Sequence, residues 1–283
     1  MAPLPQELIL RHVHIALAED IGSGDVTTLA TVPERAMARA AMAAREELVV
    51  CGLQCALAAF LQISTETRVR EVLSDGARVP AGARLLEIEG SARSLLMAER
   101  VALNFVQRLS GIATLAARFV DAIAGTRAMI FDTRKTTPGW RELEKYAVRC
   151  GGAHNHRLGL WDMVLIKDNH LVALRDAKPN AIAAAVQCAR EKFPALKIEV
   201  EADKLTQVEQ AVMAGADFIL LDNMSLDELR LAVRLVDGRA KTEASGGVNL
   251  RTVRAIAETG VDRISVGAMT HSARAVDIGL DFF

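Results

Sequence analysis

The sequence predicts an α/β protein in which a small N-terminal α+β domain is followed by an α/β barrel of parallel strands. Two observations lead to this prediction. From residue 127 onward, short apolar strands alternate with helical patterns, and the last four strands recur every 20–23 residues, which is the spacing of βα units. The residues before this point lack that rhythm and mix helical patterns with short extended stretches.

The composition suits a helix-rich α/β enzyme better than an all-β sandwich. Hydrophobic residues make up 51% of the 283 residues, whereas aromatic residues make up 4%. The formal net charge is −1, so no global field would draw the chain to nucleic acid or to a membrane. We expect neither as a partner, and any cluster of cations must act locally.

Targeting and redox signals are weak in this sequence. The first residues lack a basic segment followed by an apolar block, so no cleavable signal is expected. The uncharged stretch Leu48–Thr65 approaches membrane-spanning length, but Gly52, Gln54 and Gln62 interrupt it and favour a strand, a turn and a buried helix. The four cysteines fit neither a zinc spacing nor a disulfide framework, and we expect reduced thiols in a cytoplasmic protein.

Helical patterns in the N-terminal domain cover about residues 6–19 and 52–63, on either side of an extended stretch near 35–50. Short strands follow, separated by turns at Asp75-Gly76 and at Pro80–Gly82. A mixture of short strands and helices is typical of a small α+β domain.

A long helix then leads into the barrel. Ser91 can cap a helix over Ala92–Leu109, where apolar residues recur at helical spacing. Gly111 is expected to end this helix, because glycine after the last apolar position is a common C-terminal signal. A second helix is predicted over about Thr114–Ala124.

The barrel region contains six apolar strand candidates. They are Ala128–Phe131, Met163–Ile166, Lys197–Val200, Phe218–Leu221, Lys241–Glu243 and Arg263–Val266. Helical patterns lie between most of them, over about Asn180–Lys192, Leu205–Met213, Leu226–Val236 and Leu250–Glu258. Nearly continuous apolar strands indicate a parallel sheet that is covered by helices.

Polar residues and glycines follow each of these strands at its carboxyl end. In an α/β barrel the loops at that end form the active site. The residues are Asp132, Arg134 and Lys135; Lys167, Asp168 and His170; Glu199 and Glu201; Asp222 and Asn223; Glu243 and Ser245–Gly247; and Gly267.

Cations concentrate at the first two of these strand ends. Arg134 and Lys135 follow the first strand, Arg157 follows two glycines, and Lys167 ends the second strand. Partly buried cations are costly unless an anion meets them, so this pattern predicts a pocket for a polyanion. Alone, Arg134-Lys135 in its Pro138-containing turn could be a solvated basic turn, but the second group of cations favours a site.

Carboxylates follow the next strands. Glu199 and Glu201 point to the same side of their strand, and Asp222 ends the neighbouring one. Magnesium is usually held by one or two carboxylates together with substrate oxygens, so Glu201 and Asp222 are candidates for a magnesium–phosphate complex. The alternative is a structural salt bridge to Lys135 or Lys167.

The last two strand ends favour a phosphate site. Ser245, Gly246 and Gly247 precede the helix predicted at Leu250, where backbone N–H groups can cradle a phosphate monoester. Gly267, followed by Ala268, strengthens this interpretation, because phosphate sites in such barrels commonly use the last two loops.

Two further features have competing interpretations. His154 and His156 in one loop are a weak signal for zinc, and His156 beside Arg157 fits a hydrogen-bond donor in an anion site better. Arg100 lies within the long helix, and its pattern alone favours a helix-surface residue.

Several segments together resemble the quinolinate phosphoribosyltransferase family. They are IGSGDVTT, ERVALNFVQRLSGIAT, DTRKTTPG, EKYAV, NHRLGL, LIKDNH, EVE, LLDN, EASGGV and GVDRISVGAMTHS, most of them between about residues 95 and 277. The family joins quinolinate to 5-phosphoribosyl 1-diphosphate and releases nicotinate mononucleotide, diphosphate and carbon dioxide in NAD synthesis. The resemblance therefore implies a decarboxylating pentosyltransferase.

The resemblance also implies an architecture. It is an open-sandwich α+β domain over 1–112, an incomplete α/β barrel of about six to seven parallel strands over 113–270, and a tail, 271–283, packing back on the first domain. It further implies a cytoplasmic homodimer with shared active sites and Mg²⁺ as cofactor. Assembly beyond the dimer is left open.

Roles of single residues are carried over from the family pattern. Quinolinate would be bound by Thr133, Arg134, Lys135, His156, Arg157 and Lys167, and by Arg100 from the partner subunit. The catalytic residues would be Lys135, Glu201 and Asp222, of which Glu201 and Asp222 would hold Mg²⁺ directly or through water. Phosphoribosyl diphosphate would contact Lys135, Glu201, Asp222, Ser245, Gly246, Gly247, Gly267 and Ala268.

Two positions depart from the family pattern. Ala153 replaces a third glycine, and Trp140 stands where leucine is usual, but neither position bears charge.

A paralogous group associated with molybdate uptake shares the fold but lacks the pattern Lys167–His170. Two other classes remain as alternatives: a catalytically silent barrel that binds an anion, and a phosphosugar isomerase, which would not explain the cations at the first strand ends.

Overall fold

The computed structural model describes residues 2–283, apart from the side chains of residues 71 and 72, and the chain divides into two compact units. Unit 1 contains the residues up to Ala117 together with Glu142–Gly152 and Ser272–Phe283; unit 2 contains Arg118–Arg141 and Ala153–His271. The segment 142–152, placed by the sequence within the barrel domain, thus belongs to unit 1. No helix in the described part of the chain is both long and apolar enough to cross a membrane.

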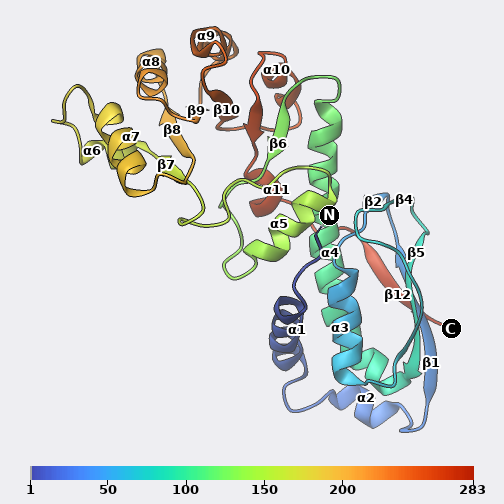
Figure 1. Ribbon diagram of the computed structural model, residues 1–283. Coiled ribbons are helices and arrows are strands. Elements are labelled where there is room, and N and C mark those ends of the chain that lie inside the picture. Colours follow the sequence, from blue (N-terminus) through green and yellow to red (C-terminus); the bar gives the residue numbers. More distant parts are fainter. Residues whose placement is uncertain (1) are drawn as a thin grey trace. The chain divides into compact units, whose positions relative to one another are not determined.

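Unit 1 is built on a four-stranded antiparallel sheet with the order β12-β1-β5-β3 (Figure 1). Its strands are β1 (Met37–Ala44), β3 (Arg68–Val72), β5 (Arg84–Ser91) and β12 (Ile278–Phe282). A two-stranded sheet pairs β2 (Leu48–Val49) with β4 (Arg78–Val79), and the first helices are α1 (Gln6–Ile21), α2 (Val26–Thr31) and α3 (Leu53–Ile63). The C-terminal tail contributes β12, a strand that the sequence did not predict, to the edge of β1.

The long helix of unit 1 does not end where the sequence predicted. Helix α4 runs without interruption over Ala92–Ala122, so the expected stop at Gly111 and the separate second helix were wrong. The reason is a close approach of another backbone: a Cβ at Gly111 would lie 2.0 Å from the carbonyl oxygen of Arg274. The glycine is needed for packing against the tail and not for ending the helix.

Helix α5 (Arg141–Cys150) was missed because its buried face is partly charged. Glu144 and Lys145 are fully buried, and Arg108 donates to the Glu144 carboxylate at 3.0 Å. Hydrophobic periodicity, on which the helix predictions depend, cannot recognise a helix that buries ionic residues.

Unit 2 is a six-stranded parallel sheet with the order β6-β11-β10-β9-β8-β7. The strands are β6 (Met129–Phe131), β7 (Val164–Ile166), β8 (Ile198–Ala202), β9 (Phe218–Asp222), β10 (Lys241–Ser245) and β11 (Arg263–Ser265), which confirms all six strand predictions. Each strand from β7 to β10 pairs with the next, and β11 pairs with the first strand, β6. This cyclic order, with no β6–β7 pair among the described strands, is that of an incomplete barrel.

Helices alternate with these strands around the sheet (Figure 1). They are α6 (Asp168–Val172), α7 (Ala181–Lys192), α8 (Leu205–Met213), α9 (Leu226–Val236), α10 (Val253–Ala257) and α11 (Ala268–His271). Helices α7, α8 and α9 lie where the sequence predicted them. Helix α10 begins at Val253, later than the predicted Leu250, because Asn249 and Thr252 bond to each other in a turn.

Candidate active site

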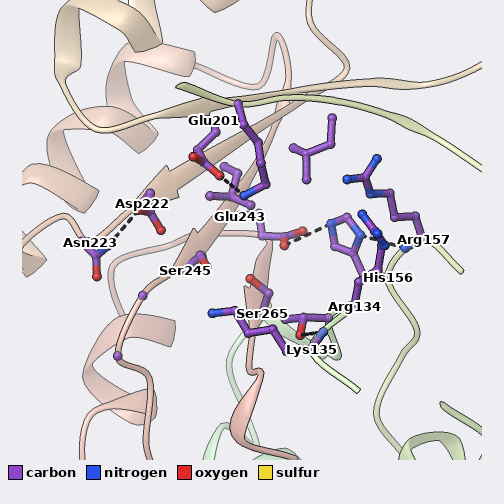
Figure 2. A pocket seen from close by; sticks show the side chains of 16 residues that line it. Arg134, Lys135, His156, Arg157, Glu201, Asp222, Asn223, Glu243, Ser245 and Ser265 are labelled. Carbon is purple, nitrogen blue, oxygen red and sulfur yellow. Dashed lines mark hydrogen bonds and ion pairs between the residues drawn. The ribbon is translucent and has the colours of Figure 1, made fainter. Parts of the chain in front are cut away.

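A pocket of about 570 Å³ lies at the carboxyl ends of the unit 2 strands (Figure 2). It is lined by Thr133, Arg134, Lys135, His156, Arg157, Leu165, Lys167, Glu201, Leu220, Asp222, Asn223, Glu243, Ser245, Gly246, Gly247 and Ser265. Three pairs of these residues stand two positions apart at one strand or its end, namely Leu165 and Lys167, Leu220 and Asp222, and Glu243 and Ser245. Alternate residues of a strand share a face, so the strands present one set of side chains to the pocket.

Cationic side chains gather on one side of the pocket, where Figure 2 shows Arg134, His156 and Arg157 together. The Nε of Arg134 is buried and has no hydrogen-bond partner among the described residues. Burial, and next the charge of Arg134, lower the pKa of the Arg157 guanidinium. A buried donor without an acceptor costs about 1–3 kcal/mol, so this side of the pocket is suited to an anion.

Asp132, fully buried at the end of β6, positions the segment that carries the cations. Its carboxylate accepts hydrogen bonds from the Asn155 side chain and from the backbone N–H of His156, both at 2.7 Å. The backbone N–H of Asp132 donates to the carbonyl of His154 at 3.0 Å. In the neighbouring turn the Thr133 hydroxyl accepts from the Lys135 N–H at 3.0 Å. The chain after β6 and the His154–Arg157 segment are thereby held side by side.

His156 lies against two carboxylates that are fully buried. Its Nε2 is 3.0 Å from Glu199 Oε2 and 3.4 Å from Glu243 Oε1. Burial lowers the pKa of His156, but the contacts with Glu199 and Glu243 outweigh burial and raise the pKa to about 9. Burial and the neighbouring Glu243 raise the pKa of Glu199.

The other ring nitrogen of His156, Nδ1, lies 2.7 Å from the backbone N–H of Arg157. Accepting that hydrogen bond requires a singly protonated ring, so it opposes the two carboxylates. The rise of the pKa from 6.5 to about 9 is worth about 3 kcal/mol, against roughly 1 kcal/mol for one backbone hydrogen bond. The carboxylates therefore outweigh this contact, and the ring of His156 carries a positive charge at neutral pH.

The acidic side of the pocket is formed by Glu201 and Asp222, which end the neighbouring strands β8 and β9. Lys167 Nζ lies 2.5 Å from Glu201 Oε2, so the salt bridge weighed as an alternative is present. The Lys167 side chain is 45% exposed, and such pairs contribute at most about 1 kcal/mol, which a charged ligand can outweigh. The Asp222 carboxylate accepts from Asn223 Nδ2 at 2.8 Å.

Two carboxylates at one edge of the sheet fit a magnesium ion that is also bound by substrate phosphate oxygens. Asp222 and Glu201 both line the pocket, next to the glycine turn after β10. The described residues do not pair His154 with His156 at a metal site: His154 stacks on Phe131 at 5.2 Å, and, of the groups of described residues that could hold a metal, the one with a histidine combines His156 with Glu199 and Glu243.

The turn after β10 requires glycine at Gly246. Its φ is +99°, and a Cβ there would lie 2.1 Å from Oδ1 of Asn223. Asn223, itself at a φ of 54°, donates its N–H to the carbonyl of Ser245 at 2.9 Å. These contacts join the ends of β9 and β10 and bring the backbone of Ser245–Gly247 to the pocket surface.

Most of the predicted site residues are brought together in this pocket, and three are not. Gly267 and Ala268 do not line it; a Cβ at Gly267 would lie 3.1 Å from Cδ of Lys135, so this glycine makes room for the lysine side chain. The Thr270 hydroxyl donates to the Lys135 carbonyl at 2.6 Å and fixes the same turn. Arg100 lies exposed on α4 in unit 1.

Sequence reasoning missed the pocket-lining role of Leu165, Leu220 and Ser265. Each stands two positions before a residue that the sequence had singled out, namely Lys167, Asp222 and Gly267. Strand alternation was therefore a signal that could have found them. The two leucines give the pocket an apolar wall against which a flat ring can lie.

Two family models match the chain. Residues 25–110 match the N-terminal domain and residues 112–281 match the C-terminal domain of quinolinate phosphoribosyl transferase. Nicotinate-nucleotide pyrophosphorylase (carboxylating) of Mycobacterium leprae is 45% identical over 272 residues, with 94% of both chains covered. Quinolinate phosphoribosyltransferase (decarboxylating) 1b of Nicotiana tabacum is 39% identical over 284 residues, with 95% of this chain and 80% of the relative covered.

Solved structures agree over the whole chain. The nicotinate-nucleotide pyrophosphorylase of Francisella tularensis superposes with a TM-score of 0.93 at 40% identity, covering 99% of this chain and 98% of the other. That of Ehrlichia chaffeensis superposes with a TM-score of 0.92 at 40% identity, with both chains covered completely at 100%.

Proposed function

The chain belongs to the quinolinate phosphoribosyltransferase family and transfers the phosphoribosyl group of 5-phosphoribosyl 1-diphosphate to quinolinate, and we propose that the unit 2 pocket is the site of this reaction. The products are nicotinate mononucleotide, diphosphate and carbon dioxide, and the reaction belongs to NAD biosynthesis. The observation that carries the proposed site is the buried Arg134 Nε, which has no acceptor among the described residues and lies in a pocket that also contains Arg157 and His156.

The cationic side of the pocket suits quinolinate. A guanidinium can bind a carboxylate through two parallel hydrogen bonds, so Arg134 and Arg157 can take one carboxylate each or share one. The His156 imidazolium adds a further charge, and Leu165 and Leu220 offer an apolar surface to the pyridine ring. In this assignment Lys167 and Thr133 also contact quinolinate.

The opposite side suits phosphoribosyl diphosphate. We place the 5-phosphate at Ser245–Gly247, where the glycine backbone allows close approach, and the ribose hydroxyls at Glu201 and Asp222. These two carboxylates would also hold Mg²⁺, whose charge would neutralise the departing diphosphate. Lys135, which has no ion-pair partner among the described residues, would lie between the two substrates. Gly267 and Ala268 would act by shaping the Lys135 turn.

The chemistry follows from charge and position. As the bond from the ribosyl C1 to diphosphate breaks, positive charge develops on the ribose, and the carboxylates of Glu201 and Asp222 stabilise it. The cations hold quinolinate with its ring nitrogen close to C1, which is a positioning effect. Once N-ribosylated, the ring nitrogen is positive and favours loss of the adjacent 2-carboxylate as carbon dioxide, because it stabilises the electron pair left at C2 until C2 takes up a proton from water.

We also propose that the protein is a cytoplasmic homodimer in which Arg100 of one subunit completes the site of the other. Support comes from the family and from the exposure of Arg100, while the buried thiols Cys51, Cys55 and Cys150, which form no disulfide among the described residues, fit a reducing compartment.

A product assay tests the proposed function. The purified protein with quinolinate, phosphoribosyl diphosphate and Mg²⁺ should form nicotinate mononucleotide and carbon dioxide in equal amounts, and addition of a chelator should stop the reaction. Ligand-induced stabilisation without any product would instead favour the silent anion-binding barrel. Turnover that persists in the chelator would contradict the role assigned to Glu201 and Asp222.

A further inference from the structure

Two fully buried carboxylates lie at a pocket that has to bind a dicarboxylate, and one of them, Glu243, lines it. Glu199 and Glu243 are both 0% exposed, and none of their four oxygens has an aligned hydrogen-bond donor among the described residues. Buried carboxylates are expensive and would repel an anionic substrate unless a cation lies close to them. Nothing in the reaction outlined above uses either residue.

The cation is His156. Glu199 comes from β8 and Glu243 from β10, on either side of β9, and both approach the same atom, Nε2, at 3.0 and 3.4 Å. Figure 2 shows Glu243 directed at the His156 ring, with Arg157 beyond it. The two acids thus hold the ring at Nε2, and Asp132 holds the backbone of the same residue by accepting its N–H.

The surrounding charges balance when the ring is protonated. Arg263 of β11 stacks between Phe131 and Phe218, with its guanidinium carbon 4.6 and 3.9 Å from the two ring centroids. Its positive charge favours the ionised form of Glu199. Two carboxylates therefore face two cations, Arg263 and His156. Arg157 and Arg134 follow towards the pocket.

We propose that Glu199 and Glu243 are positioning residues for quinolinate recognition: together they hold His156 as an oriented cation at the floor of the pocket. They act through the imidazolium, which gives the clamp one more charge than a neutral ring would. The proposal rests on the proposed function in that it assigns the charged ring to quinolinate and not to phosphoribosyl diphosphate.

The test uses the full chain with Glu199→Gln, Glu243→Gln and the double variant. Because the contacts with these acids raise the pKa of His156 to about 9, the ring stays charged below that pH and loses its charge above it. The pKa should fall towards the ordinary 6.5 when the acids are removed, and at pH 8 a ring with that pKa is protonated in about one molecule in 30. We expect the KM for quinolinate to rise about 30-fold at pH 8 in the double variant and to recover at pH 6.

Two further readouts separate positioning from a structural role. The KM for phosphoribosyl diphosphate should stay within about twofold, and NMR titration of the histidines, with His156 assigned from a His156→Gln variant, should show the fall in pKa directly. Glu144→Gln is the matched control, because Glu144 is also fully buried and paired, with Arg108, but lies in unit 1. It should leave the pH profile of the quinolinate KM unchanged.

Each single variant is expected to fold, since one remaining carboxylate still balances one imidazolium. An unshifted His156 pKa, or a quinolinate KM that is unchanged at pH 8, would overturn the proposal. So would an equal rise of both KM values at every pH together with a loss of thermal stability. A wild-type protein without quinolinate turnover would refute the proposed function instead, while the NMR titration would still test the coupling between these acids and His156.

Discussion

The surroundings of Arg134 are the most direct indication of an anion site, because its buried Nε has no acceptor among the described residues. Arg134→Ala should weaken quinolinate binding about 10- to 100-fold, as expected for the loss of charge-assisted hydrogen bonds, and leave binding of phosphoribosyl diphosphate unchanged. Calorimetric titration with each substrate measures both effects. Arg230→Ala, which removes a surface arginine paired with Asp227, is the control and should change neither. Equal weakening for both substrates would show that the two sides of the pocket are wrongly assigned.

Single residues could be predicted from the sequence where one strand end was sufficient. Arg134, Lys135, Lys167, Glu201 and Asp222 each follow an apolar strand, and parallel strands bring their carboxyl ends to one edge. Contacts between residues of two different strands could not be predicted from the sequence. The approach of Glu199 and Glu243 to His156 requires the strand order across β9 and the loop after α5, which no local pattern contains.

At the level of the element, the turn after β10 is fixed by the left-handed backbone of Gly246 and its approach to Asn223. Gly246→Ala would place a Cβ 2.1 Å from Asn223 Oδ1 and should displace the turn, raising the KM for phosphoribosyl diphosphate at least about tenfold. Steady-state kinetics with both substrates checks this. Gly215→Ala is the control, because its φ is +78° but nothing lies within 4 Å and it is not a pocket residue. A Gly246→Ala enzyme with normal kinetics would remove the turn from the proposed phosphate site.

Helices and strands with clear apolar periodicity could be predicted from the sequence. Helices whose extent or burial depends on contacts with distant segments could not. All six barrel strands and helices α7 to α9 follow apolar periodicity. Gly111 would ordinarily predict the end of a helix, but the close backbone of Arg274 is the reason for a glycine there. The buried face of α5 contains the charged residues Glu144 and Lys145, so it lacks the apolar periodicity of a typical helix. Both failures come from contacts between segments distant in sequence, which a local window cannot contain.

For the whole molecule, the central expectation is that active sites are shared between subunits. Arg100 belongs to unit 1 and Lys135 to unit 2, so inactive Arg100→Ala and Lys135→Ala subunits carry their defects in different units. In a heterodimer with shared sites, one of the two sites is intact. Random mixing should therefore restore about one quarter of wild-type activity in an assay of refolded mixtures. Absence of rescue in verified heterodimers would contradict a shared site.

In the proposed active site, the cations of unit 2 form a clamp for a dicarboxylate beside the phosphoribosyl diphosphate site. The most direct measurement is the ratio of kcat/KM for quinolinate to that for nicotinate, which lacks one carboxylate. A clamp left with unpaired buried cations should discriminate on the order of 10⁴-fold in favour of quinolinate. Turnover of nicotinate within about tenfold of quinolinate would contradict the clamp.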